Sequence, residues 1–299
     1  MRFTTERMQL LAFIIIYPLL WVVSILPHSL FYGFSDIICF VVYRIVGYRK
    51  KVVRANLELV FPNKSGEEIN RIEKEFYKHM CDMFLEMVKT MSLSKEAVKK
   101  KYHVTNVDLL REIEKKKSIL LVCSHYANWE WNVSISNYVE SKGYAVYQKI
   151  SNPYFDNWVK NVRARWNTAL ITQKETIKTV VQNHRDNVTS IYGMVSDQSP
   201  QVHRAKYWKE FMGIKVPIFT GPEFLARKLD IAVVFLKVRK VKRGHYEATF
   251  IPITLEGGKT GENEITDKFL ELTEQQINER PEHYFWTHRR WKHREKAPK

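Results

Sequence analysis

The sequence is poor in cysteine, and the three residues that it has exclude two classes of site. Cys39, Cys81 and Cys123 are odd in number, lie far apart and have apolar neighbours. A small disulfide-bonded scaffold needs paired cysteines, and a structural zinc site needs ligands at short spacings. We therefore expect a protein of a reducing compartment.

Several catalytic and cofactor motifs are also missing. No Gly-x-Ser-x-Gly sequence is present, so a serine acyl-enzyme of the α/β-hydrolase kind is not indicated. The segment Gly258-Lys259-Thr260 resembles the end of a phosphate-binding loop, but Ile253 stands where the first glycine of that loop belongs. With neither a dinucleotide-binding glycine pattern nor clustered metal ligands, we expect no cofactor and no metal.

Acidic residues are outnumbered by basic ones. The chain of 299 residues has 48 Lys and Arg against 32 Asp and Glu, for a net charge of +16. Such a charge indicates an anionic partner, which can be nucleic acid, lipid headgroups, a phosphorylated substrate or an acidic protein. Charge alone does not choose among them.

The amino terminus contains a long apolar run from Met8 to Leu26. Arg2 and Arg7 precede it, and it is about long enough to cross the hydrocarbon core of a bilayer. A second apolar stretch follows Pro27 without a small-residue cleavage site, so we read the first run as uncleaved. It can cross the membrane or dip into it, and a buried helix of a soluble protein is the alternative.

We predict two parts of the chain from this pattern. Residues 1–47 would form a membrane anchor of interfacial helices, and residues 48–299 one catalytic domain.

Strands alternate with helices in the second part, which predicts an α/β sandwich with helices on both faces of a sheet. The expected strands are Ser118 to Cys123, an extended piece near Ala145 to Ile150, Ser190 to Val195, Ile231 to Val238 and Tyr246 to Ile251, the last two paired across Arg243-Gly244. The expected helices are one long helix opened by a capping box at Ser65, and segments near Trp129 to Val139, Phe155 to Arg165, Glu175 to His184, Thr220 to Leu229 (with a second capping box) and Glu264 to Arg280.

The strongest candidate motif is Ser-His-Tyr-Ala-Asn-Trp-Glu-Trp at 124–131. It places His125 five positions before Glu130, directly after a buried strand. The spacing recurs at His103 and Asp108, but that copy lies in a polar connector, so we take it as accidental. Residues five apart face away from each other on a helix or strand, and they meet only across a turn.

A strand followed by a helix supplies such a turn. The Glu130 carboxylate would then accept the proton on one ring nitrogen of His125 and raise the basicity of the other nitrogen. The couple could remove a proton from an alcohol that attacks an activated acyl group. The alternative is structural, with His125 capping the helix and Glu130 bound to the helix terminus.

Several segments together carry a resemblance to a known family. They are RANLELVFPNKS (54–65), CSHYANWEW (123–131), RARWNTALI (163–171), YGMVSDQSP (192–200), FMGIKVPIFTGPEFLARKLDIAVV (211–234) and RPEHYFWTHRRWKHR (280–294). In this order they resemble the lysophospholipid acyltransferase superfamily and, within it, the late acyltransferases of lipid A biosynthesis. The resemblance spans most of the chain.

The resemblance implies a fold, a reaction and a location. The fold would be α/β, with a central mixed β-sheet flanked by helices, as in glycerol-3-phosphate acyltransferase, and an N-terminal membrane-anchoring helix. The enzyme would work at the cytoplasmic side of the bacterial inner membrane, in lipopolysaccharide biosynthesis. It would take a fatty acyl chain from acyl carrier protein and esterify a hydroxyl of a lipid A precursor, which is a phosphorylated glycolipid.

The resemblance also assigns roles to residues. His125 matches the catalytic base of the family and Glu130 the carboxylate that orients it. Functional Arg and Asp residues of the family fall on Arg165, or Arg163, and on Asp197. Asn128 and Trp129, in the same motif as His125, are predicted to bind substrate. The sequence departs from many members at Ser199-Pro200, which leaves the acceptor open.

Physical arguments support these roles. The thioester carbonyl develops negative charge under attack, which Arg163, Arg165 or the first N–H groups of the helix near Trp129 could stabilise. Asp197 ends a buried strand, where ligand sites of α/β sheets gather. The alternatives are two surface cations and a capping carboxylate.

The net charge fits an acidic carrier protein, a phosphorylated acceptor and membrane lipids as partners. Arginines and tryptophans alternate near the carboxyl end, as at a membrane surface. A nucleic-acid binder would not need the apolar amino terminus, so we expect no nucleic acid. Two other readings stay open, a different lipid acceptor and a catalytically inactive membrane-surface binding protein.

Overall fold

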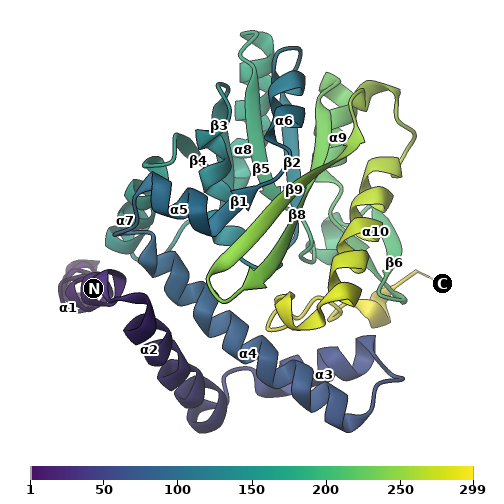
Figure 1. The fold of residues 1–299 in the computed structure, drawn as a ribbon. Coiled ribbons are helices and arrows are strands. Elements are labelled where there is room, and N and C mark those ends of the chain that lie inside the picture. Colours follow the sequence, from purple (N-terminus) through teal and green to yellow (C-terminus); the bar gives the residue numbers. More distant parts are fainter. Residues whose placement is uncertain (1, 299) are drawn as a thin grey trace.

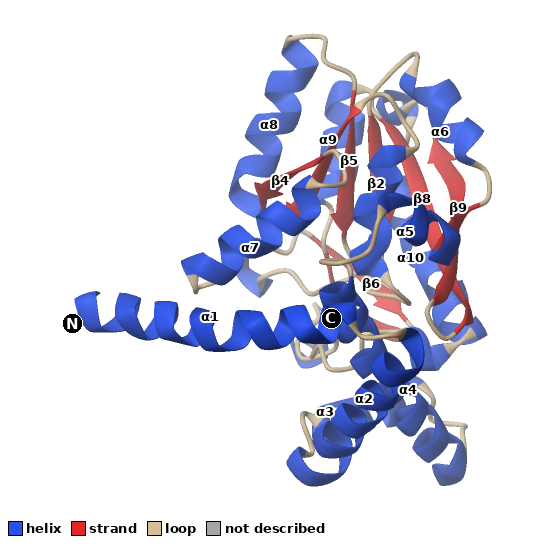
Figure 2. Cartoon of the chain, turned by 60° about the vertical axis from the view of Figure 1, so that its left-hand side comes forward, coloured by secondary structure: helices blue, strands red, loops and turns tan. Residues whose placement is uncertain are grey.

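A mixed β-sheet with helices on both faces forms the body of the protein (Figures 1 and 2). The computed structural model describes residues 2–298. Within that range, seven strands form one sheet in which only β8 and β9 pair antiparallel. In spatial order the strands are β1 (Tyr102–Val104), β9 (His245–Thr254), β8 (Ala232–Lys242), β2 (Ile119–Cys123), β5 (Ser190–Val195), β3 (Lys142–Tyr147) and β4 (Thr168–Thr172). The predicted fold class is confirmed.

The central strand β2 shows why this sheet needs two covering layers. All five of its residues are buried, because helices pack on both faces and leave no polar side. The covering helices are α5 (Lys95–Lys101), α6 (Val107–Glu114), α7 (Pro153–Ala164), α8 (Gln173–Arg185), α9 (Gly221–Leu229) and α10 (Glu264–Glu279).

The amino-terminal part is helical and lies at one end of the sheet (Figure 1). It consists of α1 (Arg2–Ile25), α2 (His28–Phe40), a π-helical turn (Val41–Val46), α3 (Lys50–Val60) and α4 (Gly66–Lys89). The capping box that opens α4 is confirmed, since the Ser65 side chain accepts from the N–H of Glu68 and Glu68 accepts from the N–H of Ser65. The N-terminal apolar helix is also confirmed, and the division at residue 47 stays a prediction.

Three predicted details were wrong or missed. The helix after the histidine motif is a 3-10 helix, η2 (Trp129–Asn137). Thr220 makes no side-chain cap on α9, because Glu223 instead accepts from the N–H groups of Asn263 and Thr266 at the start of α10. Strand β4 and the hairpin of β6 (Tyr207–Phe211) and β7 (Ile214–Ile218) had not been foreseen, although Met212-Gly213 forms its turn with positive φ at both residues.

The turn between β8 and β9 fastens the amino-terminal helices to the sheet. Arg243 in this turn donates to both carboxylate oxygens of Asp82 on α4, at 2.9 and 2.7 Å, and to Asp36 on α2, at 2.7 Å. The side chain of Asp82 is only 1% exposed. A carboxylate so deeply buried needs a hydrogen-bonded cation, because its desolvation is otherwise uncompensated.

Replacing Arg243 tests this attachment. We expect Arg243→Ala to destabilise the protein by about 3 kcal/mol, because Asp82 keeps only Lys240, at 3.6 Å, as a neighbouring cation. The matched control is Arg239→Ala on the same hairpin, which breaks an exposed pair with Glu247 and should cost under about 1 kcal/mol. Thermal unfolding in detergent measures both, and equal shifts in Tm would contradict the attachment.

Candidate active site

The carboxyl ends of two neighbouring parallel strands bring the predicted histidine and aspartate together. Cys123 at the end of β2 pairs in register with Val195 at the end of β5. His125 and Asp197 each lie two residues further along. The Nδ1 atom of His125 is 2.7 Å from Oδ1 of Asp197, and the backbone N–H of His125 donates to the same oxygen at 3.1 Å.

The charge of Asp197 determines which nitrogen of the ring carries the proton. Its side chain is 2% exposed, and burial raises its pKa, but the charge and hydrogen bonds of His125 outweigh burial and hold the pKa below its ordinary value. An ionised carboxylate can only accept, so Nδ1 must donate to it. Nε2 is then the basic nitrogen, and it lies 3.2 Å from the side-chain amide of Gln198.

Aromatic side chains form the surroundings of the ring. The ring of Trp129 lies edge-on to that of His125 with centroids 5.2 Å apart, and Phe285 stacks on it at 6.0 Å. Phe84 on α4 touches Phe285 and is 41% exposed. The His125 side chain is itself 19% exposed, so the ring lies among aromatic side chains and still reaches the solvent.

The carboxyl-terminal segment holds the loop that carries His125. The N–H of Ala127 donates to the carbonyl of His283, and the N–H of Phe285 donates to the carbonyl of His125. Ala127 has a φ of +49°, which is unfavourable for a residue with a side chain. The ring of His79 on α4 contacts the carbonyl of Ala127 at 3.2 Å, so this strained turn is fixed from two sides.

Glu130 does not contact His125 as the sequence had suggested. Its carboxylate pairs with the guanidinium of Arg163 on α7 at 2.5 Å. The physical reason is that Asp197 already occupies Nδ1 of His125, while η2 directs Glu130 toward the cation on α7. The turn between strand and helix was foreseen, but the carboxylate at the ring is that of Asp197, which follows β5.

The two predicted arginines have different surroundings. Arg165 donates to the backbone carbonyls of Thr90, Met91 and Leu93, at 3.3, 2.7 and 3.3 Å. These carbonyls follow the end of α4, where helices leave acceptors unsatisfied. Arg165 is therefore held in a structural position, and Arg163 is the arginine whose partner belongs to the histidine motif.

Asn128 and Trp129 also differ. Trp129 lies against the ring of His125, whereas Asn128 is fully buried and begins η2 by accepting from the N–H of Trp131. The amide of Asn128 donates to Glu86 on α4 at 2.8 Å, and the hydroxyl of Tyr246 donates to the same carboxylate at 2.7 Å. Burial raises the pKa of Glu86. Sequence reasoning missed Glu86, since it lies on the buried face of an apparently ordinary amphipathic helix.

A narrow apolar cavity lies beside the ion pair of Glu130 and Arg163. Its volume of about 20 Å³ leaves room for about one water molecule. Besides the ion pair it is lined by Met87, Thr90, Val133, Trp158, Val159, Val162 and Trp166. Helices α4 and α7 supply most of this lining.

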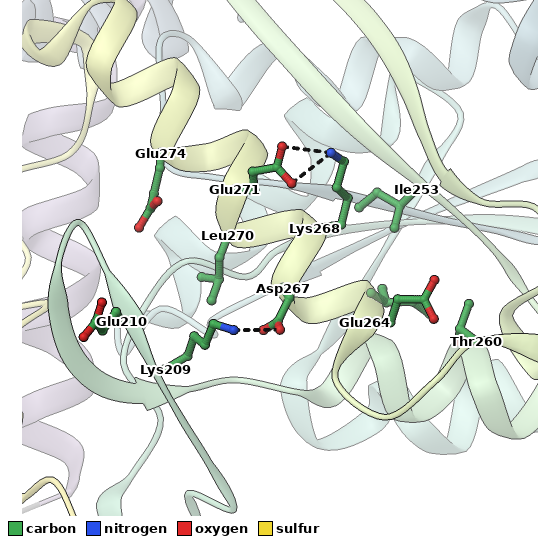
Figure 3. Close-up of a pocket in the computed structure, with 11 residues that line it drawn as sticks. Lys209, Glu210, Ile253, Thr260, Glu264, Asp267, Lys268, Leu270, Glu271 and Glu274 are labelled. Carbon is green, nitrogen blue, oxygen red and sulfur yellow. Dashed lines mark hydrogen bonds and ion pairs between the residues drawn. The ribbon is translucent and has the colours of Figure 1, made fainter.

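A wider groove lies elsewhere, between the β6–β7 hairpin and α10 (Figure 3). Acidic side chains dominate its lining, and two of them are neutralised by the pairs Lys209–Asp267 and Lys268–Glu271. None of the predicted site residues lines it. The predicted histidine and aspartate lie away from this groove, beyond the ends of β2 and β5.

Comparisons with known proteins identify the family to which the chain is similar. The family model described as bacterial lipid A biosynthesis acyltransferase matches residues 2–293. The lipid A biosynthesis lauroyltransferase of Escherichia coli (strain K12) is 24% identical over 287 residues, which cover 92% of this chain and 89% of that protein. The lipid A biosynthesis palmitoleoyltransferase of the same organism is 24% identical over 250 residues, which cover 82% of this chain and 79% of that protein.

The lowered pKa of Asp197 predicts how stability depends on pH. A carboxylate whose pKa falls on folding stabilises the protein above its unfolded value, near 3.8, and loses that contribution as the pH falls through the folded value. The difference in unfolding free energy between the wild type and Asp197→Asn should therefore be largest near neutral pH and shrink below about pH 4. Denaturant titrations at several pH values measure it. The exposed control Asp108→Asn should show no such trend, and a constant difference for Asp197→Asn would contradict the assignment.

Proposed function

Since the chain belongs to the bacterial lipid A biosynthesis acyltransferase family, we propose that it transfers a fatty acyl chain from an acyl carrier protein thioester to a hydroxyl of a lipid A precursor. One observation carries the choice of base. The ionised Asp197 holds Nδ1 of His125 at 2.7 Å, which leaves Nε2 as the proton acceptor of a side chain that is 19% exposed.

The reaction that this arrangement can perform is direct acyl transfer. Nε2 of His125 takes the proton of the acceptor hydroxyl as that oxygen attacks the thioester carbonyl carbon. When the tetrahedral intermediate collapses, the C–S bond breaks and the imidazolium returns the proton to the leaving sulfur. Asp197 stabilises the transient imidazolium, and the ester and the free thiol are the products. No covalent acyl-enzyme is needed.

The charge that develops on the carbonyl oxygen needs donors. We assign this role to Arg163 and to the first N–H groups of η2, which follow His125 in the chain. Glu130 keeps the guanidinium of Arg163 in place at 2.5 Å. In this proposal the orienting carboxylate of the base is Asp197, and Glu130 positions the arginine.

The substrates fit the surroundings of the site. The net charge of +16 favours an acidic carrier protein and a phosphorylated glycolipid at an anionic membrane surface, on the cytoplasmic side of the inner membrane. We place the start of the acyl chain in the apolar cavity beside Glu130, which side-chain movement of Trp158 would have to widen. The two relatives in E. coli are named for different acyl chains, so the family does not fix the chain length.

Removal of the base is the direct test. We expect His125→Ala to lower the rate of acyl transfer by at least about 10³-fold, because the hydroxyl loses its proton acceptor. His103→Ala is the matched control, since His103 has the same spacing to an acid but is exposed on β1. Mass spectrometry of lipid products, from acyl carrier protein thioester and a lipid A precursor, measures both. Turnover retained by His125→Ala would refute the mechanism.

Kinetic measurements can distinguish the roles of the Asp197 and Glu130 carboxylates. Asp197→Asn should lower kcat by about 10²-fold or more, since an amide can leave the ring in the wrong tautomer. Glu130→Gln should lower kcat less, because the proton acceptor and its partner remain. Steady-state rates over a pH series measure both variants. A larger loss of kcat in Glu130→Gln, with Asp197→Asn near wild type, would mean that Glu130 orients His125 during turnover.

A further inference from the structure

We propose that α1 lies along the catalytic domain within one leaflet of the membrane and does not cross the bilayer. The partner of its outer face is then the acyl-chain layer of the cytoplasmic leaflet. This inference rests on the membrane location in the proposed function, and it goes further by excluding a transmembrane anchor. Three observations carry it: contacts at both ends of α1, the composition of its outer face and the charges that flank the apolar segment.

The amino-terminal end of α1 is bound to the start of α7. The carbonyl of Gln9 accepts from the side-chain amide of Asn152 at 3.1 Å, and the amide of Gln9 donates to the carbonyl of Ser151 at 3.4 Å. One turn further along, the ring of Phe13 packs on Phe155 with centroids 5.2 Å apart. Polar and aromatic contacts therefore hold this end on the catalytic domain.

The carboxyl-terminal end of α1 is bound to the end of α4. The hydroxyl of Ser92 donates to the carbonyl of Ser24 at 2.5 Å, and the ammonium of Lys89 donates to the carbonyl of Leu26. Ser24 is fully buried in this contact. Both ends of the helix thus touch one domain, α7 at one end and α4 at the other.

These contacts are incompatible with a crossing helix. The stretch from Gln9 to Leu26 is about 25 Å long at 1.5 Å per residue, which is close to the roughly 30 Å thickness of the hydrocarbon core. A single crossing would put Gln9 on the far side of the membrane, and a helical hairpin would put the turn at Pro27 there. In either case one of the two contacts would have to span the bilayer.

The outer face of α1 shows what covers it. It consists of large apolar side chains that are each more than half exposed: Met8, Leu11, Ile14, Ile15, Leu19, Val22 and Ile25. Leu30, Ile37 and Phe40 continue this surface on α2. A soluble protein rarely exposes an apolar surface of this extent. Figure 2 shows α1 running sideways to beyond the edge of the sheet.

The flanking charges indicate the same side of the membrane for both ends. Arg7 precedes the apolar face of α1, and Arg44, Arg49 and Lys51 follow that of α2, all of them exposed. Cationic flanks tend to stay on the cytoplasmic side. The helices that α1 contacts, α4 and α7, also line the narrow cavity beside Glu130. A helix lying in the leaflet would therefore place the acyl layer next to this cavity.

Cysteine labelling from the two sides of the membrane tests the proposal. Glu6→Cys and Ser29→Cys put single exposed thiols at the two ends of α1, in a Cys39→Ala background whose other cysteines, Cys81 and Cys123, are buried. Lys178→Cys, exposed on α8, is the matched control for the catalytic domain. A membrane-impermeant maleimide is added to spheroplasts before and after lysis.

We expect all three thiols to react only after lysis. External labelling at Glu6→Cys would indicate a single crossing and at Ser29→Cys a hairpin, and either result overturns the proposal. If the thiols at the ends of α1 stay unreactive after lysis, the double variant Gln9→Cys/Asn152→Cys is the deciding test. A bifunctional maleimide should cross-link these two cysteines in membranes. Failure to cross-link would refute the contact between α1 and the start of α7. Recovery of the full chain as a soluble dimer would also overturn it. The labelling needs no substrate, so its outcome is independent of acyl transfer.

Discussion

The contact between Asp197 and His125 depends on the parallel pairing of β2 and β5. Because Cys123 and Val195 are in register, the residues two positions beyond each strand end face each other. A shift by one residue would turn Asp197 away from the ring, since successive strand residues point to opposite faces. The geometry of the His125–Asp197 pair is thus a property of the sheet. This explains why so much of the loop, including the strained Ala127, is held by backbone hydrogen bonds to the carboxyl-terminal segment.

Helix α4 connects this loop to the amino-terminal helices through buried carboxylates. Asp82 binds the hydroxyl of Ser35 on α2, and Glu86 binds the hydroxyl of Tyr32 on α2 together with the amide of Asn128 beside the catalytic loop. Each buried acid is satisfied by donors from separate parts of the chain, as the low dielectric of the interior requires. A displacement of α2 would therefore alter the hydrogen bonding of Glu86 to Asn128, three residues after His125. Buried hydrogen bonds thus connect the apolar helices to the segment that carries His125.

The sequence predicted the fold more completely than the site. Strands such as Ser190 to Val195 were read correctly because a run that is apolar on both faces has a clear signature. His125 was found for a related reason, since it directly follows such a strand. The sequence predicted Glu130 as its partner, and the structure places Asp197 at the ring, because spacing along the chain says nothing about which strand lies next to β2. Arg165 was predicted to bind substrate, and the structure shows it donating to backbone carbonyls in the segment that follows α4. A contact between residues far apart in the sequence leaves no pattern in the sequence around either residue.

The proposed roles of Asp197 and Glu130 differ because the surroundings of the two carboxylates differ. Asp197 is almost completely buried and accepts hydrogen bonds from the backbone N–H and the ring of His125. Glu130 is paired with Arg163 beside an apolar cavity, and in the proposed mechanism this fixed positive charge attracts the oxygen that becomes negative during acyl transfer. One carboxylate could not bind both Arg163 and the ring of His125, because these two partners lie in different places. In the proposed mechanism, the His-x4-Glu spacing places the base, His125, and the group that positions Arg163, Glu130, on one short turn, and Asp197 after β5 is the third member.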